Sequence, residues 1–367
     1  MIYLNNAGTT WPKPDSAIDS MNGFSSLLPD DWNEIYEEGL DTVSRFFNLP
    51  SKERFLFTTS CTSALGIALS DFPWNPGDRL VISTMEHHAL SRWFYKLQNE
   101  RGIEGVIIPR AEDGPFDIVR LESELKLGVR MVAISMASNV TGELLPYREV
   151  LDLCQQYSTL CLLDGAQTAG ILDIDISALK PHFFVFAGHK GPMGPQGIGG
   201  LYIDESVSMT CPSAACEITP GAERKGIFPT YCDTGSVNMM ALAGMTAGLK
   251  WIETQGWEKV LRHRKYLTNQ LRKGLNNIEG LSIVGEGNSE NKTGAVSIIM
   301  NDISSNKLAD MLWERSQIKL SAGFQCAPLA HEALGTDKNG TARFSVGNFN
   351  QSDDINTLLQ ALDSLHS

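Results

Sequence analysis

The stretch FFVFAGHKGPMGPQGIGGLYI, residues 183–203, decides the fold class. It holds two short apolar runs, FFVFAG (183–188) and GGLYI (199–203), on either side of a segment rich in glycine and proline. Short apolar runs bounded by turn residues are typical of strands that are buried on both faces. Five similar runs lie upstream, at 54–58, 79–84, 105–109, 130–135 and 160–164. The seven runs together predict a mainly parallel seven-stranded sheet.

The segments between most of these runs have the length and amphipathic pattern of helices. Strands that alternate with helices indicate an α/β domain. After about residue 245 the pattern changes to a long helix, four strand-like runs (281–285, 294–300, 318–322 and 342–346) and a final helix. We therefore expect a large α/β domain at 15–245, and a smaller α+β domain formed by 1–14 together with 246–367.

Composition narrows the classes of partner and compartment. The 367 residues carry a net charge of −13, which argues against nucleic acid or an anionic membrane surface as the main partner. The seven cysteines show no CxxC or zinc spacing. The chain has no recognisable signal peptide and no apolar run long enough to span a bilayer. The expected location is the cytoplasm.

The carboxyl ends of parallel strands share one edge of a sheet, and ligands bind at that edge. Polar residues that follow the predicted strands are therefore the candidates for chemistry. They are His87, Asn139, Asp164, Gln167, His189 and Lys190.

Lys190 and Asp164 suggest a particular cofactor. Lys190 follows an apolar strand among glycines, and a desolvated lysine becomes an amine nucleophile suited to Schiff-base chemistry with an aldehyde. Asp164 ends another apolar strand, where a carboxylate could keep a pyridine nitrogen protonated, as pyridoxal phosphate requires. Taken singly, a solvated loop lysine and a helix-capping aspartate are the commoner interpretations.

Four further features are weaker. His87 could stack on a cofactor ring or simply cap a helix. Residues 58–66, TTSCTSALG, could offer a helix N-terminus to a phosphate, although such runs are ordinary caps. Cys326 could be an accessible thiolate or a buried small hydrophobe. Arg343 could hold a substrate carboxylate or form a surface ion pair.

These stretches together resemble the class V aminotransferase family of pyridoxal-phosphate enzymes, and within it the cysteine desulfurases. The pair DGAQ (164–167) and GHK (188–190), with 26 residues from Asp164 to Lys190, is the most specific feature. GFQCAPLAH (323–331), followed by ARFSVGNFN (342–350), narrows the resemblance to desulfurases and close lyases. The matching stretches span almost the whole chain, and the implied architecture is fold type I of the pyridoxal-phosphate-dependent transferases.

The resemblance implies a role for each matching residue. Lys190 would bind the cofactor aldehyde and move the proton of the substrate α-carbon, and Cys326 would attack the substrate sulfur. Arg343 would hold the substrate carboxylate. The remaining roles are Asp164 at the pyridine nitrogen, Gln167 and Asn139 at the ring oxygen, Asn139 also at the substrate carboxylate, His87 stacked on the ring, Cys61, Thr62 and His189 at the phosphate, and Ser236 at the phosphate of a partner subunit.

Several positions depart from the family pattern. Cys61 and Ser236 stand where threonine is usual, Ala187 stands where serine is usual, and Ser321 stands where arginine is common. The primary hypothesis is a homodimeric desulfurase that converts L-cysteine to L-alanine and passes persulfide sulfur from Cys326 to an acceptor protein. The short loop around Cys326 resembles that of the desulfurases whose cysteine is sheltered and which need a dedicated acceptor protein. The alternatives are a C–S or C–Se lyase, an aminotransferase or epimerase acting on another amino acid, and a non-enzymatic scaffold.

Overall fold

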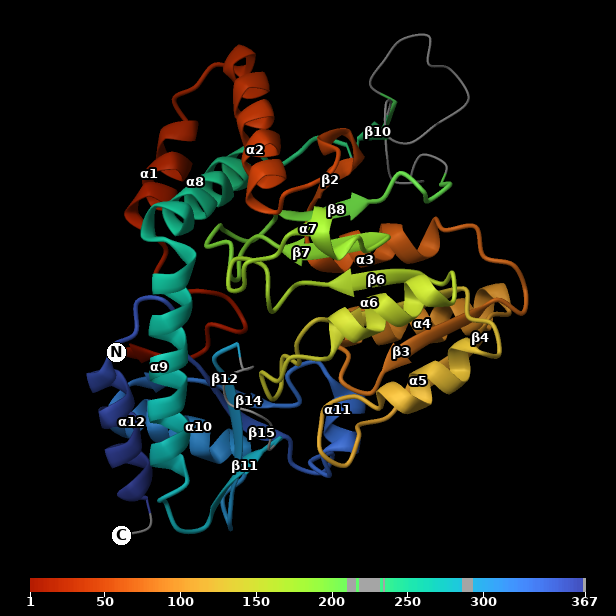
Figure 1. Cartoon of the computed structure of the whole chain (residues 1–367). Coiled ribbons are helices and arrows are strands. Elements are labelled where there is room, and N and C mark those ends of the chain that lie inside the picture. The colour runs from red at the N-terminus through yellow and green to blue at the C-terminus, as the bar shows by residue number, and fades with distance from the viewer. Residues whose placement is uncertain (210–215, 218–231, 234, 286–292, 366–367) are drawn as a thin grey trace.

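The computed structural model describes residues 1–209, 216–217, 232–233, 235–285 and 293–365. Figure 1 shows a large sheet with helices on both faces, and a smaller sheet beside which both chain termini lie. This arrangement agrees with the α/β class that the alternating pattern predicts.

The large sheet has seven strands in the order β2-β8-β7-β6-β5-β3-β4. β8 runs antiparallel to both of its neighbours, and the other pairs are parallel. The strands are β2 (Phe55–Thr58), β3 (Arg79–Ser83), β4 (Glu104–Ile108), β5 (Met131–Ser135), β6 (Leu160–Asp164), β7 (Phe183–Ala187) and β8 (Gly199–Ile203). The mainly parallel seven-stranded sheet predicted from the sequence is confirmed.

Both faces of this sheet are buried because successive side chains of a strand point to opposite faces. In β7, Phe184 and Phe186 pack into one core, while Phe183 and Val185 pack into the other. α3 (Cys61–Ser70) and α4 (His88–Arg101) cover the second face. The first face is covered by α2 (Trp32–Phe46), α5 (Ile118–Leu125), α6 (Tyr147–Gln156) and α8 (Met239–Gln255).

The second sheet is antiparallel and lies in the C-terminal part of the chain. Its order is β11 (Leu281–Val284), β12 (Ala295–Met300), β15 (Thr341–Ser345) and β14 (Ser321–Gly323). A separate apolar core joins this sheet to α9 (Trp257–Leu275), α10 (Ser305–Ser316) and α12 (Ser352–Asp363). The proposed domain boundaries at 14–15 and 245–246 stay a prediction.

The N-terminal segment bridges the two parts of the chain. β1 (Ile2–Tyr3) pairs in parallel with β13 (Ile318–Lys319). A few residues on, the Thr10 amide donates to the backbone oxygen of His189, next to the end of β7. The segment therefore contacts β13 in the C-terminal part of the chain and the loop that carries Lys190.

The predicted strand at 318–322 is wrong in its extent. Residues 318–319 form β13 and pair with β1, whereas Ser321–Gly323 form β14 and pair with β15. The remaining elements are α1 (Asp15–Phe24), α7 (Ile176–Leu179), α11 (Pro328–Ala333), the pair β9 (Cys216–Glu217) and β10 (Cys232–Asp233), and two 3-10 turns at Pro29–Asp31 and Lys52–Arg54. Among the described helices, none has the length and apolar character needed to cross a bilayer.

Candidate active site

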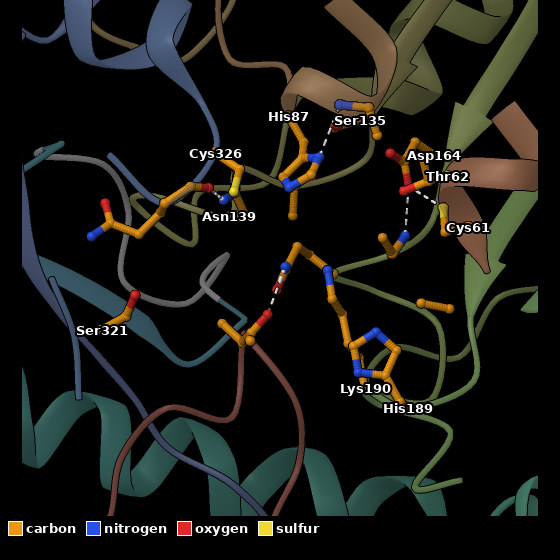
Figure 2. Close-up of a pocket in the computed structure, with 18 of the residues that line it drawn as sticks. Cys61, Thr62, His87, Ser135, Asn139, Asp164, His189, Lys190, Ser321 and Cys326 are labelled. Atoms are coloured by element: carbon orange, nitrogen blue, oxygen red, sulfur yellow. Dashed lines mark hydrogen bonds between the residues drawn. The ribbon is translucent and has the colours of Figure 1, made fainter. Parts of the chain in front are cut away.

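A cavity of about 330 Å³ lies at the carboxyl ends of the central strands, between the large and small sheets. Asp164 ends β6 and Lys190 follows β7, so the shared strand polarity brings their side chains to one edge. The small sheet contributes Arg343 from β15 and Ser321 from β14. Figure 2 shows side chains from both parts of the chain around one space.

Asp164 is the buried acid of the cavity. Its Oδ1 accepts hydrogen bonds from the Ala166 amide at 2.8 Å and from the Cys61 thiol at 3.4 Å. Burial raises the pKa of this carboxyl, and the Ala166 bond and the nearby Lys190 charge oppose the shift. The acid is therefore placed to bind a protonated ring nitrogen that enters the cavity.

Lys190 is the cavity amine. Burial lowers its pKa below that of an ordinary lysine, and the neighbouring Cys61 and Asp164 act in the opposite direction. The neutral amine, which is the nucleophilic form, is thus more accessible at a given pH than for a solvated lysine. Lys190 and Asp164 both line the cavity, as their sequence positions predict.

His87 is the N-cap of α4 and also faces the cavity. Its Nδ1 accepts from the Ala89 amide at 3.0 Å, so in the neutral ring Nε2 carries the proton and is left to donate to a ligand. Burial and the Lys190 charge lower its pKa to about 3, so the ring is neutral near pH 7. His87 therefore both caps α4 and lines the cavity, so the two interpretations of it from the sequence are compatible.

The cavity offers donors that suit a phosphorylated group. Cys61 and Thr62 form the first turn of α3, where backbone amides have no acceptor within the helix. Nδ1 of His189 is buried and has no partner among the described residues. A phosphate bound here would find helix amides and a histidine, while the acid of Asp164 would receive the ring nitrogen. The residues present therefore fit pyridoxal phosphate.

Arg343 supplies the cation on the side of the small sheet. One of its terminal nitrogens donates to the Asn139 backbone oxygen at 2.6 Å, and the other donates to Oδ1 of Asn5 at 3.1 Å. Nε of Arg343 and Oδ1 of Asn139 are buried without partners among the described residues. Burial lowers the pKa of Arg343 to about 10, so the guanidinium stays charged at neutral pH. This group can pair with a substrate carboxylate.

Cys326 lies on a loop with unusual backbone geometry. Gln325 and Cys326 have φ of 40° and 58°, in the left-handed region that non-glycine residues seldom adopt. Two hydrogen bonds hold the loop from outside: Nδ2 of Asn139 donates to the Gln325 backbone oxygen at 2.6 Å, and the His88 amide donates to the Cys326 backbone oxygen at 2.7 Å. The thiol is thereby fixed at the cavity wall.

The Gln325 side chain anchors the same loop from beneath. Its amide donates to the Thr341 backbone oxygen at 2.9 Å, and its Oε1 accepts from the Thr341 hydroxyl at 3.0 Å. Nε2 of the fully buried His331 lies 3.1 Å from that same Oε1. Because Oε1 can only accept, His331 must carry its proton on Nε2, with Nδ1 accepting from the Thr336 hydroxyl at 2.7 Å.

Most of the residues predicted from the sequence come together in this cavity. They are Cys61, Thr62, His87, Asn139, Asp164, Gln167, His189, Lys190, Cys326 and Arg343. Ser236 is exposed and lies outside the cavity lining, so its role toward a partner subunit stays a prediction. The expectation of a sheltered cysteine is wrong for the chain as described, because Cys326 is exposed.

Some contacts differ from the implied roles. The resemblance implies a phosphate contact for Cys61, but its thiol donates to Asp164. It implies a contact with the ring oxygen for Gln167, whose side-chain amide donates to the Ala7 backbone oxygen at 3.0 Å. Gln325 also lines the cavity, although no role was predicted for it. The available signal was a polar residue directly before the candidate nucleophile Cys326.

A second residue missed by sequence reasoning is Glu86, which is fully buried behind the cavity. It accepts from the Ser135 amide and hydroxyl at 2.8 and 2.6 Å, and from the Ser83 hydroxyl at 2.5 Å. Burial raises its pKa to about 7, against the effect of these bonds. Glu86 ties the end of β3 to the end of β5, directly before His87. An acid next to the His-His pair was its only sequence signal.

The chain belongs to the aminotransferase class-V family, whose model matches residues 2–358. A similar curated protein is the probable cysteine desulfurase of Pyrococcus abyssi, 28% identical, with 100% of this chain and 94% of the relative covered. The fold is also that of the apo cysteine desulfurase from Thermococcus onnurineus NA1, with TM-score 0.90, 25% identity, and 99% and 94% of the two chains covered.

A more distant structural neighbour carries a different activity. It is the cystine C-S lyase C-DES in complex with its reaction product cysteine persulfide, with TM-score 0.84, 21% identity, and 98% of this chain and 97% of that chain covered. At this identity the likeness shows the fold alone. The same architecture is thus found in a protein described as a cystine C-S lyase.

Proposed function

We propose that this protein is a pyridoxal-phosphate-dependent cysteine desulfurase that converts L-cysteine to L-alanine and leaves a persulfide on Cys326. The observation that carries the proposal is the convergence of Lys190, Asp164, Arg343 and Cys326 on one cavity. The desulfurases among the relatives and structural neighbours support the same reaction. None of these findings favours a lyase or aminotransferase over a desulfurase.

The chain's own residues would hold the cofactor at three points. Lys190 is the amine for the aldehyde, Asp164 is the acid for the ring nitrogen, and the first turn of α3 with His189 receives the phosphate. When bound, pyridoxal phosphate supplies an electron sink for negative charge that develops at the substrate α-carbon. The neutral ring of His87 faces the same space and provides a flat surface for stacking.

Substrate orientation falls to Arg343 and Asn139. The guanidinium of Arg343 is charged and held by two neighbours, so it can bind the carboxylate of cysteine without first becoming ordered. With the carboxylate held there, the substrate α-carbon is directed to Lys190 and its sulfur to the Cys326 loop. Once its amine is free, Lys190 can take the α-proton, because burial favours the neutral form.

Cys326 is the nucleophile for sulfur. Its thiolate attacks the substrate sulfur, forming an S–S bond while the bond between that sulfur and the β-carbon breaks. The electron pair of the broken bond stays on the three-carbon fragment. The fragment takes up one proton at the β-carbon and, at the α-carbon, the proton that Lys190 returns, and it leaves as alanine. Cys326 then carries the transferred sulfur as a persulfide. An acceptor thiolate regenerates Cys326 by attacking the terminal sulfur.

We also propose two partners. Exposure of Cys326 supports delivery of sulfur to a separate acceptor protein, because the persulfide can be reached from outside. Exposure of Ser236, together with the family resemblance, supports a homodimer in which Ser236 contacts the other subunit's phosphate site. The cytoplasmic location stays a prediction from the sequence.

The experiment compares the wild type with Cys326→Ser. Both proteins are incubated with L-cysteine and a thiol reductant, and alanine and sulfide are measured. We expect the wild type to form both products, and Cys326→Ser to lose nearly all alanine formation while it retains the bound cofactor's absorbance. Equal alanine from both proteins would remove Cys326 from the reaction. Pyruvate and ammonia in place of alanine would identify a lyase.

A further inference from the structure

A group of three metal-binding side chains lies at the mouth of the cavity. His87, His88 and Cys326 each offer one ligand atom, and these atoms lie within 4.8 Å of one another. In the part of the chain that the structure describes, Cys326 is exposed and His88 is half-buried, so an ion can reach the group from solvent. The roles assigned above use His87 and Cys326 but give His88 no task.

The chemistry of the three ligands selects the kind of metal. Two imidazoles and one thiolate are a common donor set for Zn²⁺, which binds nitrogen at about 2.0–2.1 Å and sulfur at about 2.3 Å. In a tetrahedral site such bonds place the ligand atoms roughly 3.3–3.8 Å apart. The ligand atoms of this group lie within 4.8 Å of one another. Rotation of the side chains by about one ångström would bring them to the distances of a tetrahedral site.

The backbone holds the ligands near this geometry before any metal arrives. The His88 amide donates to the Cys326 backbone oxygen at 2.7 Å, which joins the start of α4 to the cysteine loop. Nδ1 of His87 accepts from the Ala89 amide, so the proton of the neutral ring lies on Nε2. Metal binding at Nε2 requires this proton to move to Nδ1, which costs the Ala89 hydrogen bond. The rings of His87 and His88 lie with centroids 4.8 Å apart at an interplanar angle of 70°. Figure 2 shows His87 and Cys326 as neighbours at the cavity wall.

We propose that His87, His88 and Cys326 form a binding site for Zn²⁺, with the fourth position open to water. Binding releases the thiol proton of Cys326 to solvent, because the metal takes the thiolate. Occupancy withdraws Cys326 and His87 from the cavity, so the metal also inhibits the enzyme. The inhibition rests on the proposed function, whereas the metal site stands apart from it.

The test uses the holoprotein with Co²⁺ as a spectroscopic probe and Zn²⁺ as a competitor. A thiolate-containing tetrahedral site gives intense Co²⁺ bands in the visible region, where they are read apart from the cofactor. We expect one equivalent of Co²⁺ to produce these bands in the wild type and one equivalent of Zn²⁺ to abolish them. Cys326→Ser should lose the thiolate bands, and His88→Gln should weaken Zn²⁺ binding at least about tenfold.

The matched control is His263→Gln, the same change at a histidine of α9 that lies outside the group. It should bind Zn²⁺ like the wild type. Retention of wild-type Zn²⁺ affinity by His88→Gln, or absence of the visible Co²⁺ bands from the wild type, overturns the proposal. Alkylation of Cys326 by iodoacetamide is a second readout that needs no turnover. Zn²⁺ should slow it in the wild type and not in His88→Gln, and equal protection in both proteins would also overturn the site.

Activity separates the two proposals. Zn²⁺ should suppress alanine formation in the wild type, and His88→Gln should keep most of that formation at the same metal concentration. If no variant forms alanine while the Co²⁺ spectra are as expected, the desulfurase assignment fails and the metal site stands. If alanine forms and His88→Gln is inhibited as strongly as the wild type, the metal site fails and the desulfurase assignment stands.

Discussion

Replacing Gln325 by alanine tests whether the cysteine loop is held in place by the side chain beneath it. The change removes one hydrogen bond to the Thr341 backbone, one from the Thr341 hydroxyl and one from His331. It leaves the buried His331 without the acceptor for its Nε2. The nucleophile itself is untouched, because the substitution lies one residue before Cys326.

The expected effect of Gln325→Ala on kcat follows from two opposing contributions to the free energy of the loop. Left-handed backbone at Gln325 and Cys326 costs about 1–2 kcal/mol for each residue, or about 2–4 kcal/mol together. Three hydrogen bonds at about 1 kcal/mol each contribute a similar amount in the other direction. Without them the loop relaxes in a large fraction of molecules. Because Cys326 is then less often in position, we expect the activation free energy to rise by about 1.4–2.7 kcal/mol, which is a 10- to 100-fold decrease in kcat.

The assay measures alanine formation, KM for cysteine and the absorbance of bound cofactor. We expect Gln325→Ala to lower kcat with little change in KM, since Arg343 and Asn139 remain. The cofactor absorbance should be retained. The matched control is Gln155→Ala, at an exposed position on α6, which should behave as the wild type. Iodoacetamide reactivity of Cys326 should change in Gln325→Ala alone.

A wild-type kcat in Gln325→Ala would refute the reasoning, provided that thermal unfolding confirms the loss of the buried hydrogen bonds. An equal fall in kcat and cofactor content would also count against it, because it would locate the damage in the cofactor site and not in the loop. Gln325→Glu gives a further comparison. It keeps the acceptor for His331 but places a carboxylate oxygen against the Thr341 backbone oxygen, so it should recover only part of the rate.

Three other outcomes follow from the site. Lys190→Ala should abolish both the visible absorbance of bound cofactor and alanine formation while the protein stays folded by circular dichroism; activity near the wild type would exclude Lys190 as the cavity amine. Arg343→Lys should raise KM for cysteine at least about tenfold with a smaller effect on kcat, because an ammonium cannot form the forked pair with a carboxylate; an unchanged KM would place the substrate carboxylate elsewhere. The pKa of Glu86 is raised to about 7 by burial, so the folded state binds a proton that the unfolded state has released between about pH 4.5 and 7, and stability falls as pH rises through that window. Urea unfolding at pH 5 and pH 8 measures the difference in unfolding free energy between these two pH values, and Glu86→Gln should reduce that difference by up to roughly 3 kcal/mol. The same difference in both proteins would show that Glu86 is not the titrating group.

The parts of the molecule that could be predicted depend on local pattern and on strand polarity. Apolar runs such as 183–187 predict buried strands. Because the strands are mostly parallel, residues at their carboxyl ends then lie at the same edge of the sheet. Lys190 and Asp164 meet for this reason, although neither position reveals the meeting alone. Arg343 and Cys326 were weak candidates from the residues alone, and the family resemblance gave them roles. Arg343 lies on β15 and Cys326 on the loop after β14, and periodicity could not place either against the large sheet.

The features that escaped prediction are set by pairing between distant segments. The run 318–322 reads as one strand, but β1 from the N-terminus takes Ile318 and Lys319 while β15 takes the following residues. The bond from Cys61 to Asp164 joins residues 103 positions apart. The support of Gln325 by His331 depends on a buried side-chain orientation. Such contacts leave no periodic trace in the sequence.

The most direct test of the central claim is the mass of Cys326 after one turnover without reductant. The purified protein is mixed with one equivalent of L-cysteine, and the peptide that contains Cys326 is measured by mass spectrometry together with released alanine. We predict alanine and a Cys326 peptide heavier by one sulfur atom, in equal amounts. Alanine without added sulfur on Cys326, or added sulfur on another cysteine in its place, would contradict the account.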